Sequence, residues 1–272
     1  NGIINFNTTA QMGRNNLYLS YEELLLLFNR FYYFPTPNQL GIDIHIKKHV
    51  AQYAENIFKY LGAKEVDTYD FSNYEGANII HDMNHRVDAI HESKYSLVID
   101  SGTLEHIFNF PTAIHNCMKM LKIGGCFVAM TPANNFCGHG FYQFSPELFY
   151  NLFSTQNGFN PTKMIVCEDR KNPKFYNVSD PSIIRERVIL ENIYPTYIYF
   201  VAKKENDVTG LTYPQQSDYI LTWNGSCYSH NYGFVNSVSA KIKRNILRYI
   251  YEVLVKPYNN KLHFNETFLE IH

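Results

Sequence analysis

The stretch from residue 65 to residue 135 constrains the fold of this chain more than any other part of its sequence. It contains short apolar runs that end in an acidic residue or a turn and alternate with stretches of helical spacing, at 65–70, 79–82, 96–100 and 126–131. Such alternation is typical of a parallel α/β sheet. In these sheets, ligands bind at the carboxyl ends of the strands, which is where Asp70, Asp82 and Asp100 fall.

The order of these residues resembles that of the class I S-adenosylmethionine-dependent methyltransferases. The resemblance spans roughly residues 50–160 and rests on the three aspartates, on Leu-Glu-His at 104–106 and on Leu-Lys-Ile-Gly-Gly at 121–125. Residues 134–147 are similar to a subgroup of bacterial enzymes associated with surface-polysaccharide and small-molecule modification. The resemblance implies a Rossmann-like α/β sheet with helices on both faces and S-adenosyl-L-methionine as cofactor.

We expect three regions along the chain: an N-terminal helical segment at 1–38, a methyltransferase-like α/β domain at 39–205 and a C-terminal extension at 206–272. In the first region, Ser20 and Glu23 have the spacing of a capping box. A helix is expected from there through residue 34, before Pro35 and Pro37.

The C-terminal extension contains an amphipathic stretch at 240–258 that carries five Lys and Arg residues. Its basic side chains indicate either a solvated face of a packing helix or peripheral contact with an anionic surface. Before that, strands at 163–168 and 197–203 are expected to close the sheet as an antiparallel pair at its edge. The segment 171–192 between them is expected to be an insertion that caps the substrate pocket.

The first motif of the family is the place where this sequence departs from the resemblance. A strand is expected at 39–46 and a helix at 50–61, yet Gly41 is the only glycine between 39 and 50. The family has a glycine-rich loop there, where missing Cβ atoms let the backbone approach the cofactor. The degenerate first motif leaves two alternatives: unconventional cofactor binding, or weakened or lost binding.

The resemblance places eight residues around the cofactor: Tyr53, Asp70, Phe71, Asp82, Met83, Asp100, Ser101 and Gly102. Asp70 would accept hydrogen bonds from both ribose hydroxyls, because two carboxylate oxygens can accept two donors. Asp82 would lie beside the adenine amine, with Met83 packed on the ring. The alternative for either aspartate is a cap or turn residue.

Three residues are candidates for catalysis: Glu105, His106 and His139. A histidine is suited to proton transfer near neutral pH. Glycines flank His139, so its imidazole is expected to be exposed in the substrate site, where Tyr142 and Gln143 would also contact the acceptor. The alternatives are a structural role for His106 and an incidental turn around His139.

We expect no metal ion at these residues. Some members of the family that methylate hydroxyls use a Glu and a His here together with a metal. This chain has Thr103 where those members carry a further acidic ligand, which argues against a three-ligand site.

Composition excludes some classes of function. The formal net charge of −1 across 272 residues gives no global basic field that would attract nucleic acid. No apolar run approaches the ~18 residues of a membrane span. The five cysteines have no paired spacing, and the polar start lacks a signal-peptide core, so a cytoplasmic location is expected. The oligomeric state stays open.

The function expected from the sequence is O-methylation of a small molecule or of a sugar or capsular polysaccharide precursor by S-adenosyl-L-methionine. One alternative is a non-catalytic, methyltransferase-like scaffold, which the degenerate first motif suggests. Another is a nucleotide-sugar-binding protein, because Asp70 would serve either ribose-containing ligand.

Overall fold

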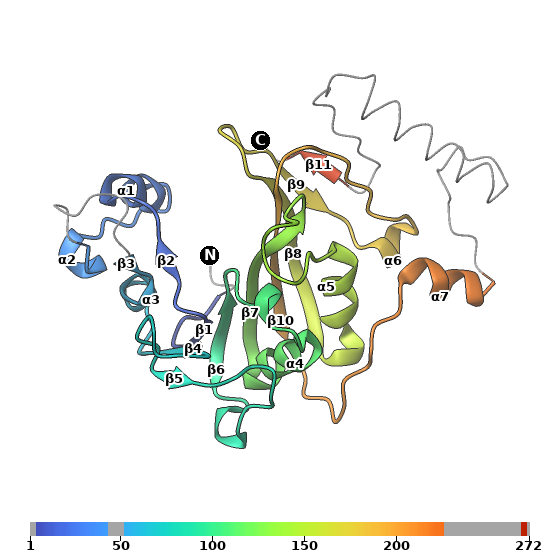
Figure 1. Cartoon of the computed structure of the whole chain (residues 1–272), viewed down its shortest axis with the longest axis horizontal. Helices are drawn as coiled ribbons and strands as arrows, with labels where there is room; N and C mark the ends of the chain where they lie inside the picture. The colour runs from blue at the N-terminus through green and yellow to red at the C-terminus, as the bar shows by residue number, and fades with distance from the viewer. Residues whose placement is uncertain (1–3, 43–51, 226–267, 271–272) are drawn as a thin grey trace.

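The computed structural model describes residues 4–42, 52–225 and 268–270, and shows an α/β fold built around one mixed sheet (Figure 1). In chain order, the nine strands of this sheet are β1 (Thr8–Met12), β4 (Glu65–Asp70), β5 (Ile79–Ile80), β6 (Tyr95–Asp100), β7 (Leu121–Asn134), β8 (Phe159–Glu168), β9 (Phe175–Val178), β10 (Thr196–Lys204) and β11 (Phe268–Glu270). A separate antiparallel pair consists of β2 (Asn16–Leu17) and β3 (Gln52–Tyr53).

The strands lie in the order β11-β9-β8-β10-β7-β6-β1-β4-β5. Strands β5, β4, β1, β6 and β7 pair in parallel, whereas β10, β8, β9 and β11 are joined by antiparallel pairs. The strand order reverses at β1, because the chain continues to β4 on one side of it and later returns to β6 on the other. In an open α/β sheet, the crevice beside such a reversal is the usual place for a ligand.

Helices cover both faces of the sheet, as expected from the sequence (Figure 1). Alternate residues of β6 contact different cores: Val98 packs with α4 and α5, whereas Leu97 and Ile99 pack with Ala54 and Phe58 at α3. The helices are α1 (Tyr21–Asn29), α2 (Pro37–Leu40), α3 (Glu55–Tyr60), α4 (Phe110–Met120), α5 (Pro146–Leu152), α6 (Pro181–Ile184) and α7 (Ser217–Trp223). Among the described residues, no helix combines the length and apolarity needed to cross a bilayer.

The main correction concerns where the sheet begins. The first strand is β1, so the N-terminal region contributes the strand at which the order reverses and is not only a helical addition. The strand expected at 39–46 is wrong in its described part, because Pro37–Leu40 forms α2. The Thr36 hydroxyl and the Gln39 side chain make a capping box there, and Gly41 ends the helix with φ +62°. Residues 43–51 lie outside the described residues.

Other boundaries also differ from the expectation. The capping box of Ser20 and Glu23 is present, but α1 ends at Asn29 and does not continue to residue 34. The helix expected at 50–61 starts at Glu55, because Tyr53 pairs with Asn16 in the small sheet. The strands β8 and β10 pair antiparallel as expected, but they do not close the sheet.

Two further expectations concern the later part of the chain. Residues 171–192 contribute β9, which extends the sheet beyond β8, and α6. The basic stretch at 240–258 lies outside the described residues.

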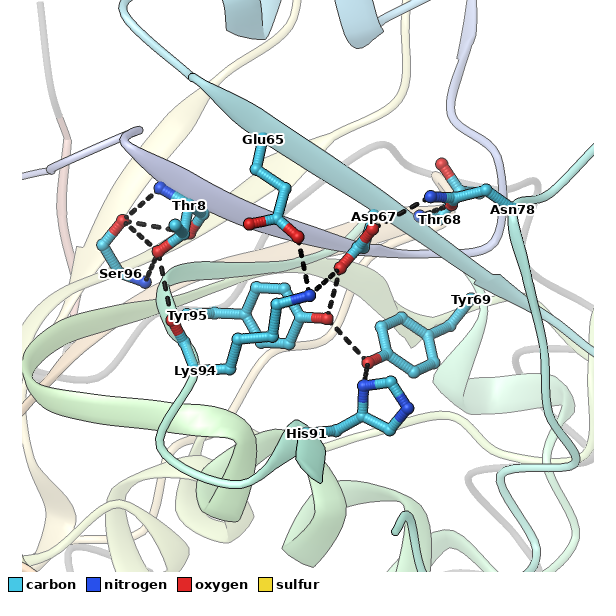
Figure 2. Close-up of polar contacts among 10 residues, drawn as sticks. All are labelled: Thr8, Glu65, Asp67, Thr68, Tyr69, Asn78, His91, Lys94, Tyr95 and Ser96. Atoms are coloured by element: carbon cyan, nitrogen blue, oxygen red, sulfur yellow. Dashed lines mark hydrogen bonds and ion pairs between the residues drawn. The ribbon is translucent and has the colours of Figure 1, made fainter. Parts of the chain in front are cut away.

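A buried polar network links β4, β1 and β6 (Figure 2). Asp67 accepts hydrogen bonds from Tyr95 Oη (2.6 Å), Lys94 Nζ (2.6 Å) and Asn78 Nδ2 (2.9 Å). Strand β1 lies between β4 and β6, so Asp67 contacts Tyr95 across it. The residue of β1 that is paired with Asp67 is Ala10, whose one-carbon side chain leaves room for this contact. Burial alone would raise the pKa of Asp67, but these hydrogen bonds outweigh it and lower the pKa.

Candidate cofactor pocket and active site

A pocket of about 600 Å³ lies at the carboxyl ends of β1, β4 and β6, where the strand order reverses. Its walls are the segment 13–18 after β1, Asp70 at the end of β4, residues 101–103 after β6, and side chains of α3. His106 and Met130 also line it. Its volume lies within the range of pockets that enclose a cofactor or a drug-sized molecule, about 300–1,000 Å³.

The loop after β1 supplies the close backbone approach that the sequence analysis looked for elsewhere. Gly13 has φ +65°, and a Cβ at this position would collide with Thr103 Oγ1. Thr103 Oγ1 donates to Met12 O at 2.8 Å, and Gly13 N donates to Tyr69 O at 2.8 Å. The loop is therefore held from both sides at a position that favours glycine. It is a single glycine between Met12 and Arg14, not a Gly-x-Gly pattern.

Arg14 fixes the next wall of the pocket. Its Nε donates to Glu55 Oε1 at 2.7 Å, and its Nη1 donates to Glu75 O at 2.6 Å. The guanidinium carbon lies 3.7 Å from the centre of the Tyr53 ring, which it covers. Arg14 therefore joins the β1 loop to the start of α3. Tyr53, which was expected at the cofactor, packs beneath Arg14, and its role in binding stays a prediction.

Asp70, expected at the ribose, lines the pocket, whereas Phe71, also expected at the cofactor, does not. Asp70 Oδ1 accepts a hydrogen bond from Ser72 N at 3.1 Å, which leaves the second carboxylate oxygen open to a ligand. The Phe71 side chain is exposed. This geometry is compatible with Asp70 as the ribose acceptor.

Asp82 and Met83 lie outside the pocket. Asp82 accepts hydrogen bonds from Asn84 N (2.9 Å) and Asn84 Nδ2 (2.7 Å), as a turn aspartate does, and these bonds lower its pKa. Met83 is buried in the core that contains α4, so it offers no face for an adenine ring. The expected contact of Asp82 with adenine stays a prediction.

The segment after β6 contains two pocket residues and a buried support. Ser101 and Gly102 line the pocket, whereas Asp100 is fully buried. Asp100 Oδ1 accepts hydrogen bonds from Thr103 N (3.0 Å) and Leu104 N (3.2 Å). Burial, followed by the nearby Glu105, raises the pKa of Asp100 to about 8. Asp100 thus shapes the loop, and its expected contact with the cofactor stays a prediction.

The three candidates for catalysis lie together. One ligand atom each from Glu105, His106 and His139 falls within 4.8 Å of the others. The Glu105 carboxylate is fully buried, its Oε1 lies 3.3 Å from His139 Nε2, and the imidazole of His139 is 47% exposed. The rings of the two histidines lie 4.8 Å apart, and His106 lines the pocket. The cluster therefore adjoins the pocket that Asp70 also lines.

The loop that carries His139 is held against Glu105 by its backbone. Phe141 N and Tyr142 N both donate to Glu105 O, at 2.8 and 3.2 Å. Gly140 has φ +70°, and a Cβ there would lie 2.9 Å from Glu105 O and Cγ. The glycine after His139 is thus needed for close approach to Glu105 and does more than free the imidazole. A Cβ at Gly138 would meet no atom within 4 Å.

Tyr142 and Gln143 support this loop. Tyr142 Oη donates to Phe108 O at 2.6 Å, and its ring packs beside Phe144. Gln143 Oε1 accepts a hydrogen bond from Phe136 N at 2.8 Å, which closes the base of the loop. Neither residue lines the pocket. Their expected contact with the acceptor stays a prediction, although Tyr142 Oη and Gln143 Oε1 already have partners within the protein.

Sequence reasoning missed Gly13, Arg14 and Glu55. The sequence pattern that could have revealed the loop is a glycine directly after residues 8–12, where polar Thr9 and Gln11 alternate with apolar Ala10 and Met12. That run did not read as a buried strand because Thr9 and Gln11 are polar. Both are fully buried, and their side chains are hydrogen-bonded: Thr9 Oγ1 donates to Phe6 O, and Gln11 Nε2 donates to Glu55 and Thr68.

No protein-family model and no curated protein matches this chain. Among solved structures, it is similar to a putative methyltransferase, BH2331, from Bacillus halodurans C-125, with 14% identity over 57% of this chain and 87% of that chain, at a TM-score of 0.38. It is also similar to the N-methyltransferase NodS from Bradyrhizobium japonicum WM9 in complex with S-adenosyl-L-homocysteine, with 11% identity over 74% and 79% of the two chains, at a TM-score of 0.37.

Proposed function

We propose that this protein is an S-adenosylmethionine-dependent methyltransferase that methylates a hydroxyl of a small molecule or of a sugar precursor. One observation carries the proposal: a single cavity at the strand reversal is lined by both Asp70 and His106, and His106 adjoins Glu105 and His139. The carboxylate proposed for the ribose and the cluster proposed to accept the proton border the same space, which supports transfer between a cofactor and an acceptor.

The residues suggest how the acceptor would be activated. Methyl transfer from a sulfonium is an in-line displacement, so positioning and loss of the acceptor proton are the main requirements. With Nε2–H donating to the buried Glu105 carboxylate, His139 is oriented and keeps Nδ1 as the proton acceptor, in the manner of a carboxylate that orients a catalytic imidazole. The acceptor hydroxyl would give its proton to this nitrogen as its oxygen attacks the methyl carbon.

The position of Gly13 removes the main reason to propose a non-catalytic scaffold. That alternative arose because no glycine-rich loop was found between 39 and 50. The strand at the reversal is β1, and the residue that follows it is a glycine with φ +65°. A cofactor could therefore approach the backbone of this loop without a Cβ in the way.

The test is methyl transfer from labelled S-adenosyl-L-methionine to a panel of hydroxylated acceptors that includes sugars and nucleotide sugars. Replacement of the general base in His139→Ala should lower turnover by roughly 10²–10⁴-fold while S-adenosylhomocysteine affinity stays nearly unchanged. His115→Ala, a change on α4, is the matched control. Full turnover in His139→Ala would exclude His139 as the general base. The proposed function would be excluded if the protein neither transferred a methyl group to any acceptor nor bound S-adenosylhomocysteine.

A further inference from the structure

Glu105 has too few partners for a fully buried carboxylate. Its Oε2 is 3.5 Å from Thr131 Oγ1, and its Oε1 is 3.3 Å from His139 Nε2. No Lys or Arg of the described segments forms an ion pair with it. A buried carboxylate is costly unless a cation or several donors compensate it. The site therefore calls for positive charge beside Glu105.

The ligand atoms around Glu105 have the chemistry of a transition-metal site. Two imidazoles and one carboxylate form a set typical of zinc and non-haem iron, whereas magnesium and calcium favour oxygen ligands. At metal–ligand distances of ~2.0–2.2 Å, two ligand atoms lie roughly 3.0–3.5 Å apart. The 3.3 Å between Glu105 Oε1 and His139 Nε2 fits this spacing as it stands.

The third ligand atom can complete the site with a small movement. The three ligand atoms fall within 4.8 Å of one another, so the widest separation exceeds a metal-bound spacing by roughly 1.5 Å. His106 is exposed and follows directly after Glu105, so its side chain can rotate at the expense of its edge contact with the His139 ring. His106 also lines the pocket, which leaves a position on that side open for a substrate oxygen.

We propose that Glu105, His106 and His139 bind one divalent transition-metal ion beside the pocket, with an open position for the acceptor's hydroxyl. The catalytic part of this proposal rests on the proposed function and changes one role in it, because the ion then activates the acceptor in place of His139. When the ion is bound, His139 is a ligand rather than the proton acceptor, and the ion favours ionisation of the coordinated hydroxyl. That hydroxyl loses its proton to water, and its oxygen then bonds to the methyl carbon as the carbon–sulfur bond breaks. The sequence argued against a metal because of Thr103; in this proposal, His139 on the loop after β7 takes the place of the third ligand.

The binding test uses the full-length, untagged protein after removal of metals by chelation. Titration with Co²⁺, followed by visible absorption, should show one site per chain, which Zn²⁺ displaces and Mg²⁺ does not. Glu105→Gln, His106→Ala and His139→Ala should each weaken binding by more than the ~10–100-fold typical of outer-shell changes. His85→Ala is the control, because that side chain is 79% exposed and lies outside the cluster. Equal Co²⁺ binding by the wild type and the His106 and His139 variants would overturn the proposal, even if Glu105→Gln fails to fold.

Two further readings separate this proposal from the proposed function. S-adenosylhomocysteine is titrated into the same metal-free protein, because cofactor binding through Asp70 does not need the ion. Cofactor binding without a Co²⁺ site would refute the metal and leave the methyltransferase standing, whereas the reverse would refute the methyltransferase alone. If an acceptor is found, turnover should be lost on chelation and restored by Zn²⁺ or Co²⁺. Full turnover of the metal-free protein would overturn the catalytic role of the ion.

Discussion

Replacing Gly13 by alanine should destabilise the protein through two separable effects. The first is the backbone conformation: a non-glycine residue at φ +65° costs about 1–2 kcal/mol, of which the lower entropy of the unfolded alanine chain offsets roughly 0.4–1 kcal/mol. The second is the collision with Thr103 Oγ1. Thr103 is β-branched and bonded to Met12 O at 2.8 Å, so its displacement loses a hydrogen bond worth about 0.5–1.5 kcal/mol.

The expected total for Gly13→Ala is about 2 kcal/mol in the free energy of unfolding, within a range of about 0.5–3 kcal/mol given by the sum of these contributions. Gly124→Ala is the matched control, because Gly124 has φ +83° and a Cβ there would meet nothing within 4 Å. The control should lose only the net backbone contribution, about 1 kcal/mol. Urea unfolding midpoints of the two variants measure the difference.

A double-mutant cycle isolates the collision. Thr103→Ala alone should cost about 1 kcal/mol through its lost hydrogen bond, but it should cost little or nothing when Gly13 is already alanine. If Gly13→Ala were no more destabilising than Gly124→Ala and showed no coupling to Thr103→Ala, the close contact between the β1 and β6 loops would be refuted.

Two further predictions concern buried carboxylates. Asp67→Ala should lower the free energy of unfolding by about 2–4 kcal/mol, because buried Tyr95 Oη and its neighbours lose their acceptor (Figure 2). Lys94→Ala should lower it by about 1 kcal/mol or less, since Lys94 is partly exposed. Equal unfolding midpoints for the two variants would contradict the network. Asp100 has a raised pKa of about 8 against 3.8 when unfolded, so the folded state binds the extra proton and wild-type stability should fall as pH rises from about 4 to 8. Asp100→Asn keeps the acceptor for Thr103 N and Leu104 N but cannot ionise, so its unfolding midpoint should gain on the wild type between pH 5 and pH 9; parallel pH profiles would show that Asp100 is not buried as described.

Much of the fold was predictable from local patterns. The apolar runs predicted β4, β6 and β7, and the spacing of Ser20 and Glu23 predicted the capping box that starts α1. These signals are local because apolar spacing and capping involve residues within one or two turns of each other. The placement of helices on both faces of the sheet was implied by the resemblance to the methyltransferase family, and the structure confirms it.

The first strand could not be found in this way, because its buried polar side chains are satisfied by distant residues. Gln11 Nε2 donates to Thr68 Oγ1, 57 positions away, and to Glu55 Oε1, 44 positions away. From sequence alone, a polar residue argues for exposure. The displaced first strand then led to the search for the glycine between 39 and 50, although Gly13 occupies the corresponding place after β1.

The candidate site shows the same limit. The sequence pointed to Glu105, His106 and His139 as candidates but did not show that they lie together. Their proximity depends on Gly140, which passes close to the Glu105 backbone. Tyr142 and Gln143 were named for their stacking and hydrogen-bonding groups. Those groups are used within the loop, by Phe108 O and Phe136 N, which residue types alone do not reveal.

We propose that an adenosyl cofactor binds in the pocket at the strand reversal, with Asp70 on its ribose. The most direct measurement is calorimetric titration of S-adenosylhomocysteine into the wild type, Asp70→Ala and the surface control Asp88→Ala. The wild type and the control should bind with equal affinity in the micromolar range. Loss of a charge-assisted contact should cost Asp70→Ala about 1.5–3 kcal/mol, roughly a 10–150-fold weaker Kd. No heat of binding to the wild type, or equal affinity in Asp70→Ala, would contradict this account.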